Sequence, residues 1–151
     1  MATPKTIVLS VNSVQVNYLP TYERFAAETL TPGDLVKMTA AGKFGHQANT
    51  ERWGGYVVVE SEYALEGTTS ALDDTYAADE LAFAVMPNRG DLLYLWITDG
   101  ETIAVGDLLV MADDTGKLVE RTTEDLSLVI GVAEEAVSPS GANARCRVRL
   151  I

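Results

Sequence analysis

The residues of this chain that could carry chemistry are few and far apart. The sequence holds one histidine and one cysteine, His46 and Cys146. His46 lies in the polar stretch Phe44–Gln47, where we expect an exposed loop histidine, and with no second histidine there is no histidine-rich metal site. Cys146 shares one face of the last expected strand with Ala144 and Val148, which favours a buried structural thiol over a nucleophile.

Carboxylates gather in one polar connection, residues 66–80, which contains Asp73, Asp74, Asp79 and Glu80. They could offer oxygen ligands to Ca²⁺, but they lack the alternating spacing of a calcium loop. No phosphate loop, dinucleotide fingerprint, Cys-x-x-Cys pair or hydrolase elbow accompanies them. We therefore expect a solvated acidic loop, no metal, no cofactor and no enzymatic activity. A metal-dependent hydrolase built on this loop ranks well below the functions considered next.

Two basic motifs allow more than one interpretation. Arg89-Gly90-Asp91 is the tripeptide that integrins recognise, but it falls on a Gly-Asp turn that occurs twice more in the chain. The turn alone explains it. Arg145, Arg147 and Arg149 alternate along the last segment, so their side chains lie on one face of a strand. They either pair with the protein's own acidic side chains or form a stripe that docks on an acidic partner.

Composition excludes several partners. The chain has 151 residues and a net charge of −11, which argues against sequence-independent binding to nucleic acid. No apolar run is long enough to span a membrane, and no basic-then-apolar leader opens the chain. We expect a protein made in the cytoplasm, with neither nucleic acid nor membrane as a partner.

The strands and turns that must position these residues are expected from a duplicated stretch of sequence. Glu28–Met38 matches Glu101–Met111 without a gap, and each copy continues to a Gly-Lys turn, Gly42-Lys43 or Gly116-Lys117. Each copy contains a Gly-Asp turn that leads into an apolar strand. Many short strands with glycine turns predict an all-β fold, a small antiparallel β-barrel or sandwich with an internal pseudo-repeat. We expect one pseudo-symmetric barrel made of two similar halves.

An extended arm precedes this barrel. Apolar residues alternate at Ile7, Leu9 and Val11 and again at Val14, Val16 and Tyr18, which predicts a β-prone segment. Tyr22–Glu28 is the one stretch that could form a short helical turn. The expected organisation is therefore an arm with a helical turn over residues 1–28 and a β-barrel domain over residues 29–151.

Several of these motifs occur together in a known family. The chain resembles the small β-barrel capsid decoration (cement) proteins of tailed bacteriophages in three motifs. These are a Gly-Asp-Leu-Leu-Val strand followed by Gly-Lys (106–117), the segment Ile130–Ala136, and a Val-Arg-Leu-Ile end (148–151). Asp73–Glu80, leading into a strand, is similar as well. The resemblance implies a protein on the virion exterior, made in the host cytoplasm, that stabilises the lattice of the major capsid protein. It also implies self-association as a homotrimer.

In such proteins the arm commonly contacts the capsid or a neighbouring subunit. The expected contact residues come from the arm and the acidic loop: Ile7, Leu9, Val11, Val14, Val16, Tyr18, Asp73, Asp74 and Tyr76. An apolar extended arm can add a strand to an exposed edge of a partner, and many weak contacts on a lattice give stable occupancy.

The alternative function comes from a different class. A carbohydrate-binding β module on a virion or cell surface would use Trp53 and Tyr56 as a stacking platform. The second indole, Trp96, sits inside an apolar strand, so we expect it in the core.

Overall fold

The described part of the chain is built from short strands. The computed structural model describes residues 6–10, 21–61, 71–122 and 128–151. The strands are β1 (Val8–Ser10), β2 (Thr21–Phe25), β3 (Leu35–Met38), β4 (Phe44–His46), β5 (Tyr56–Val58), β6 (Leu81–Val85), β7 (Leu92–Ile97), β8 (Leu108–Met111), β9 (Leu118–Glu120), β10 (Val129–Ala133) and β11 (Ala144–Leu150). The predicted all-β class is confirmed. No helix long and apolar enough to cross a membrane occurs in these ranges.

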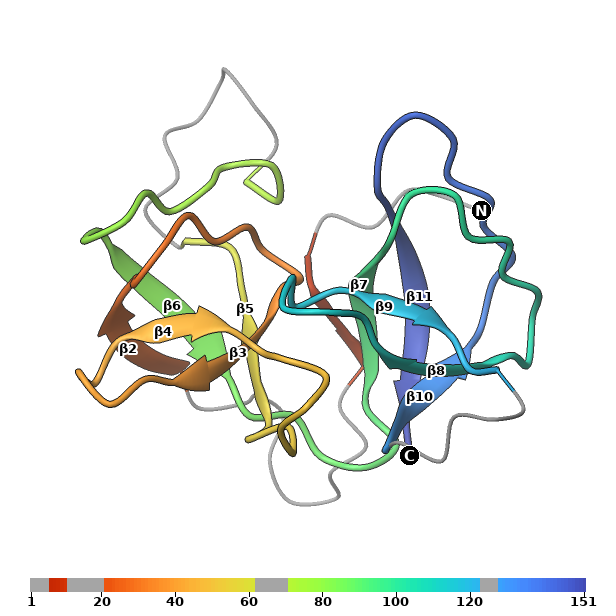
Figure 1. Ribbon diagram of the computed structural model, residues 1–151, viewed down its shortest axis with the longest axis horizontal. Coiled ribbons are helices and arrows are strands. Elements are labelled where there is room, and N and C mark those ends of the chain that lie inside the picture. Colours follow the sequence, from red (N-terminus) through yellow and green to blue (C-terminus); the bar gives the residue numbers. More distant parts are fainter. Residues whose placement is uncertain (1–5, 11–20, 62–70, 123–127) are drawn as a thin grey trace.

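Apart from β1, the described strands form two closed five-stranded units, called the N-terminal and C-terminal rings, which lie side by side (Figure 1). In the C-terminal ring the order is β7-β11-β10-β8-β9, and a parallel pair between Ile97 and Leu118 joins β9 back to β7. The N-terminal ring has the order β2-β6-β5-β3-β4, and its two edge strands meet at the bridge between Ala26 and Phe44. β1 is an added strand on β7.

The two rings repeat one topology. Adding five to each strand number of the N-terminal ring reproduces the order of the C-terminal ring. The closing hydrogen bonds also correspond, since Ala27 N–H donates to Phe44 O at 2.7 Å and Thr98 N–H donates to Leu118 O at 3.0 Å. The predicted repeat is therefore present, but its unit is a complete five-stranded sheet and not half of one shared barrel.

Along the strands of the N-terminal ring, successive side chains point to opposite faces, and this explains how the two rings are joined. Val36, Val58 and Ala84 face a small core inside this ring. Their neighbours Leu35, Val57 and Val85 point to the opposite face, where they align across three strands and enter the larger core of the C-terminal ring. Strands that are apolar on both faces cannot leave either face in water, so the two rings pack as one body.

The predicted helical turn at Tyr22–Glu28 is wrong. Thr21–Phe25 forms β2, which pairs residue by residue with β6 from Thr21–Val85 to Phe25–Leu81. A helix here would need an apolar face to bury, whereas every residue of β2 is exposed. Residues 11–20, most of the predicted arm, lie outside the described residues, so the division of the chain at residue 28 stays a prediction.

Candidate functional site at the junction of the two rings

The three Gly-Asp turns have the same geometry, and they fix the corners of the rings. In each turn the aspartate carboxylate accepts the backbone N–H three residues earlier, in the pairs Thr31–Asp34 (2.8 Å), Asn88–Asp91 (2.7 Å) and Ala104–Asp107 (2.7 Å). Each glycine takes a positive φ, 98° at Gly33, 88° at Gly90 and 94° at Gly106. The prediction that these motifs are turns is confirmed, and the Arg-Gly-Asp motif is one of them.

Two glycines allow the rings to approach closely. Gly116, in the hairpin between β8 and β9, accepts the Leu35 N–H at 2.8 Å through its carbonyl. A Cβ at this position would lie 2.4 Å from Leu35 O. At Gly33, a Cβ would lie 3.1 Å from Tyr94 O and 3.2 Å from Trp96 Cδ1. Backbone of each ring therefore touches the other, and these positions admit no larger residue without movement.

A charged cluster forms where Gly116 meets the first ring. Asp34, with a side chain only 2 % exposed, faces His46 Nε2 at 3.0 Å and Lys117 Nζ at 3.4 Å. On its other side, His46 Nδ1 lies 3.3 Å from Glu28 Oε2. Lys117 comes from the C-terminal ring and the other three residues from the N-terminal ring, so the cluster links the rings.

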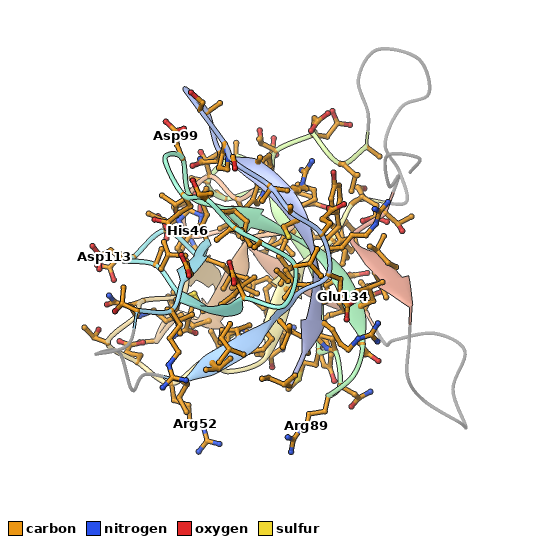
Figure 2. All side chains as sticks on the ribbon, turned by 90° about the vertical axis from the view of Figure 1, so that its right-hand side faces the viewer. His46, Arg52, Arg89, Asp99, Asp113 and Glu134 are labelled. Atoms are coloured by element: carbon orange, nitrogen blue, oxygen red, sulfur yellow. The ribbon has the colours of Figure 1, made fainter. Side chains whose placement is uncertain are left out.

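The prediction for His46 is therefore wrong. Its side chain is 17 % exposed and lies in β4, not in an exposed loop. Figure 2 shows His46 within the body of the molecule, whereas Arg52 and Arg89 extend from its lower edge. Burial lowers the pKa of His46, but the hydrogen bond and negative charge of Asp34, together with Glu28, outweigh burial and raise the pKa above 6.5. Sequence reasoning missed this because both carboxylates and Lys117 are distant in the chain.

Arg145 makes a second link between the rings. Its guanidinium donates to Pro32 O from both Nε (3.3 Å) and Nη2 (3.1 Å), and Nη2 also bonds Leu72 O. Nη1 pairs with Asp73 at 3.1 Å, and the guanidinium carbon lies 4.0 Å from the centre of the Trp96 ring. The other two arginines of the row pair with Glu135 and Glu134. Of the two interpretations of this row, pairing within the protein is the one observed.

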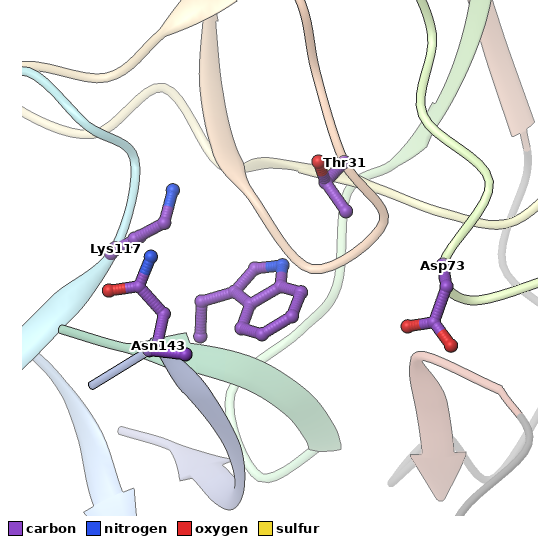
Figure 3. Close-up of a pocket in the computed structure, with 6 residues that line it drawn as sticks. Thr31, Asp73, Lys117 and Asn143 are labelled. Carbon is purple, nitrogen blue, oxygen red and sulfur yellow. The ribbon is translucent and has the colours of Figure 1, made fainter. Parts of the chain in front are cut away.

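Beside Arg145 the junction is hollowed. The junction hollow has a volume of about 370 Å³ and is lined by Thr31, Asp73, Trp96, Lys117, Ala142 and Asn143. Figure 3 shows Lys117 and Asn143 on one side of it and Asp73 on the other. Trp96 is half-buried, and its indole N–H donates to Pro32 O at 3.0 Å. The expectation that Trp96 lies in the core was wrong, because its side of this strand faces the junction.

The predicted contact residues of the arm have different placements. Ile7 is fully buried in the larger core, and its carbonyl accepts the Tyr94 N–H at 2.8 Å. Leu9, in β1, is half-buried. Val11, Val14, Val16 and Tyr18 lie outside the described residues. Ile7 is thus already engaged within the chain, and contact by this arm with a partner stays a prediction.

The three contact residues predicted in the acidic loop do not share one environment. Asp73 is exposed and pairs with Arg145, and Asp74 is half-buried. Tyr76 is only 7 % exposed, and its hydroxyl donates to Val59 O at 2.8 Å. Burial, reinforced by the charges of Glu60 and Asp74, raises the pKa of Tyr76 well above 10.0. Tyr76 therefore fastens this segment to the N-terminal ring, whereas Asp73 remains accessible.

Other candidate groups are placed in structural roles. Cys146 is fully buried, as predicted, and burial raises the pKa of its thiol to about 12. Asp91 of the Arg-Gly-Asp motif is also fully buried, which leaves it unavailable to a receptor. Among the residues with described placement, no three His, Cys, Asp or Glu side chains are arranged to hold a metal ion.

The proposed sugar platform is not assembled. Tyr56 is partly buried and packs against the core of the N-terminal ring, edge-on to Tyr22 with ring centres 5.6 Å apart. Trp53 packs against the larger core, and its indole N–H donates to Tyr56 O at 3.1 Å. The two aromatic side chains pack against different clusters, which does not favour a shared stacking platform.

The fold and the junction together define an all-β protein made of two duplicated five-stranded units. The sequence matches no protein-family model and no curated protein. A solved structure with a similar fold is the N base of the head fiber gp8.5 in bacteriophage phi29. The TM-score is 0.55 with 16 % sequence identity, and the match covers 89 % of this chain and 98 % of that chain. At this identity the likeness establishes a shared fold.

Proposed function

We propose that this protein is a non-enzymatic structural component of the head of a tailed bacteriophage. The observation that carries the proposal is the tandem fold, which is similar over 89 % of this chain to the N base of a phage head fiber. The resemblance of the Gly-Asp and C-terminal motifs to capsid decoration proteins points to the same particle. The resemblance of these short motifs and the likeness of fold thus point to one class of function.

In the finer form of the proposal, the protein binds the outer surface of the shell and stabilises the lattice of the major capsid protein. The net charge of −11 suits a protein that faces solvent outside the particle and does not touch DNA. Self-association as a trimer would multiply its contacts with the lattice, so that weak single contacts give stable occupancy.

The environments of the reactive groups support a non-enzymatic role. Both ring nitrogens of His46 face carboxylates, at 3.0 Å and 3.3 Å, within a cluster that joins the rings. Cys146 is buried, with the pKa of its thiol raised to about 12, which leaves almost no thiolate at neutral pH. The groups best suited to chemistry are engaged in holding the fold.

A contact surface is available on the N-terminal ring. Phe25 of β2 is 55 % exposed and lies directly opposite Leu81 of β6, which is 42 % exposed. The whole of β2 is exposed, and exposed apolar residues on a sheet margin are a common site of protein association. We propose that this surface, together with the arm, contacts the capsid or a neighbouring copy.

The test is cosedimentation of the purified protein with expanded capsids of the encoding phage, prepared without this protein. We expect the intact chain to sediment with the capsids. Phe25→Ser with Leu81→Ser should weaken binding by about tenfold or more, because apolar surface at the contact is lost. Val105→Ser is the matched control, since Val105 is 67 % exposed on a turn of the other ring.

The arm is tested separately by Val14→Asn, Val16→Asn and Tyr18→Asn in one chain. These changes leave β1 and the buried Ile7 in place, whereas deletion of the whole arm would remove a strand from the fold. Failure of the intact chain to bind would overturn the head role. Unchanged binding by either variant would remove that surface from the contact.

A further inference from the structure

We propose that the junction hollow binds one or two units of a neutral saccharide. This site goes beyond the head role and does not depend on it. The hollow draws its lining from both rings, with Thr31 from the N-terminal ring and Trp96, Lys117 and Asn143 from the C-terminal ring. Its volume of about 370 Å³ lies in the range of small-molecule sites, which often form between two packed units.

The aromatic part of the hollow is held rigidly. Trp96 is fixed by its hydrogen bond to Pro32 O and by the Arg145 guanidinium, 4.0 Å from the ring centre. Arg145 is itself held by Asp73, so neither side chain has to be ordered when a ligand arrives. A preformed indole surface at the wall of a polar hollow suits the C–H groups of a sugar ring.

The polar side chains around the indole retain hydrogen-bonding capacity. Asn143 uses Oδ1 to accept the Asp99 N–H at 2.9 Å, which leaves its Nδ2 group as a donor. Asp73 pairs with Arg145 through Oδ1, and its Oδ2 has no partner among the described residues. The Thr31 hydroxyl likewise bonds no described residue. Donors and acceptors on several sides of an aromatic surface match a ligand that carries many hydroxyl groups.

Charge selects against anionic ligands. Lys117 is the cation of the hollow, and it already faces the buried Asp34 at 3.4 Å. Asp73 is the anion of the hollow and pairs with Arg145 at 3.1 Å. The hollow therefore offers no unmatched positive charge to a phosphate or a carboxylate, and a neutral polyol is the ligand class that fits.

The test is an NMR titration of the full chain with four neutral disaccharides: maltose, lactose, mannobiose and N,N′-diacetylchitobiose. The sequence contains two tryptophans, Trp53 and Trp96, so the indole N–H signals provide a site and an internal control. We expect at least one disaccharide to shift the Trp96 signal saturably while the Trp53 signal stays fixed. Asn143→Ala and Thr31→Val should each weaken binding by up to about tenfold, because each removes one hydrogen bond.

Asn49→Ala is the matched control, because Asn49 lines a separate hollow beside Trp53. It should leave saccharide affinity unchanged. The proposal is overturned if none of the four sugars gives a saturable shift, if the Trp53 signal moves instead, or if Asn143→Ala binds as well as the natural chain. Tighter binding of glucose 6-phosphate than of any neutral sugar would overturn the ligand class. Capsid cosedimentation is measured without sugar, so failure of this proposal and failure of the head role are distinguishable.

Discussion

Asp34 combines a role in its own turn with a charge contact across the junction. It closes its own turn by accepting the Thr31 N–H at 2.8 Å, and it faces both His46 and Lys117. A carboxylate that is 2 % exposed would be costly without such partners. Among the described residues, the carboxylate of the corresponding Asp107 accepts only the N–H of its own turn, so the first copy of the turn is the one that contributes to the junction.

His46 makes the junction sensitive to pH. Its pKa in the folded protein is raised by Asp34 and Glu28 against the opposing effects of burial and Lys117. Because the folded pKa exceeds the unfolded value, the stabilisation is fully present below pH 6.5 and is lost as pH rises through the raised pKa. We expect His46→Gln to destabilise the fold most at mildly acidic pH. The measurement is the urea unfolding free energy of both chains across this range, and a difference that does not change with pH would contradict the assignment.

The two Gly-Lys turns allow a matched test of close packing. Gly42 and Gly116 both have positive φ, 74° and 67°, but only Gly116 has backbone within reach of a Cβ. Gly42→Ala should cost about 1 kcal/mol from backbone strain alone. Gly116→Ala should cost about 3 kcal/mol, because the Leu35 carbonyl must also move. Denaturant unfolding measures both, and equal costs would mean that the rings do not meet at Gly116.

At the scale of elements, β11 joins the rings through one arginine and not through its whole basic row. The Arg145 side chain is 8 % exposed and that of Arg149 is 46 % exposed, although both pair with a carboxylate. Arg145→Ala should destabilise the protein by about 2–3 kcal/mol, since it removes the donor to the carbonyl of the buried Leu72 and a largely buried cation that bridges several groups. Arg149→Ala should cost less than about 1 kcal/mol, as is usual for exposed pairs. Thermal unfolding of both variants decides this, and similar losses would contradict the structural role of Arg145.

Local patterns in the sequence predicted the strands and turns better than the pairings that close each ring. The Gly-Asp corners and the inward face of β11 were predictable, because a positive φ and alternation leave a local signal. Each ring is closed by one β-bridge, Ile97–Leu118 or Ala26–Phe44. The residue types at these positions do not indicate which residue each one pairs with. For the same reason β2 was predicted as a helical turn, since its pairing with β6 decides its conformation.

The candidate site was harder to predict than the fold. Asp73 was singled out in the sequence, but the hollow it shares with Thr31 and Trp96 exists only because two copies of one unit pack together. Likewise, His46 gains its charged surroundings from Glu28, Asp34 and the second ring's Lys117. A site built at the junction of two repeats has no motif of its own in either repeat.

At the scale of the whole molecule, the protein is a two-ring body with a net charge of −11 and an exposed apolar margin at Phe25 and Leu81. The shared core and the backbone contacts at Gly33 and Gly116 favour unfolding of both rings in one transition. The shared core holds the two rings together as one body. This fits the proposed place on a phage head.

The most direct test of that place is electron cryomicroscopy of heads from the encoding phage, with and without the gene for this protein. We expect density on the outer surface of the shell that fits the two rings, with the β2–β6 margin toward the shell or a neighbouring copy. This density should vanish when the gene is deleted. Heads that look identical with and without the gene, or density confined to the tail or the interior, would contradict the account.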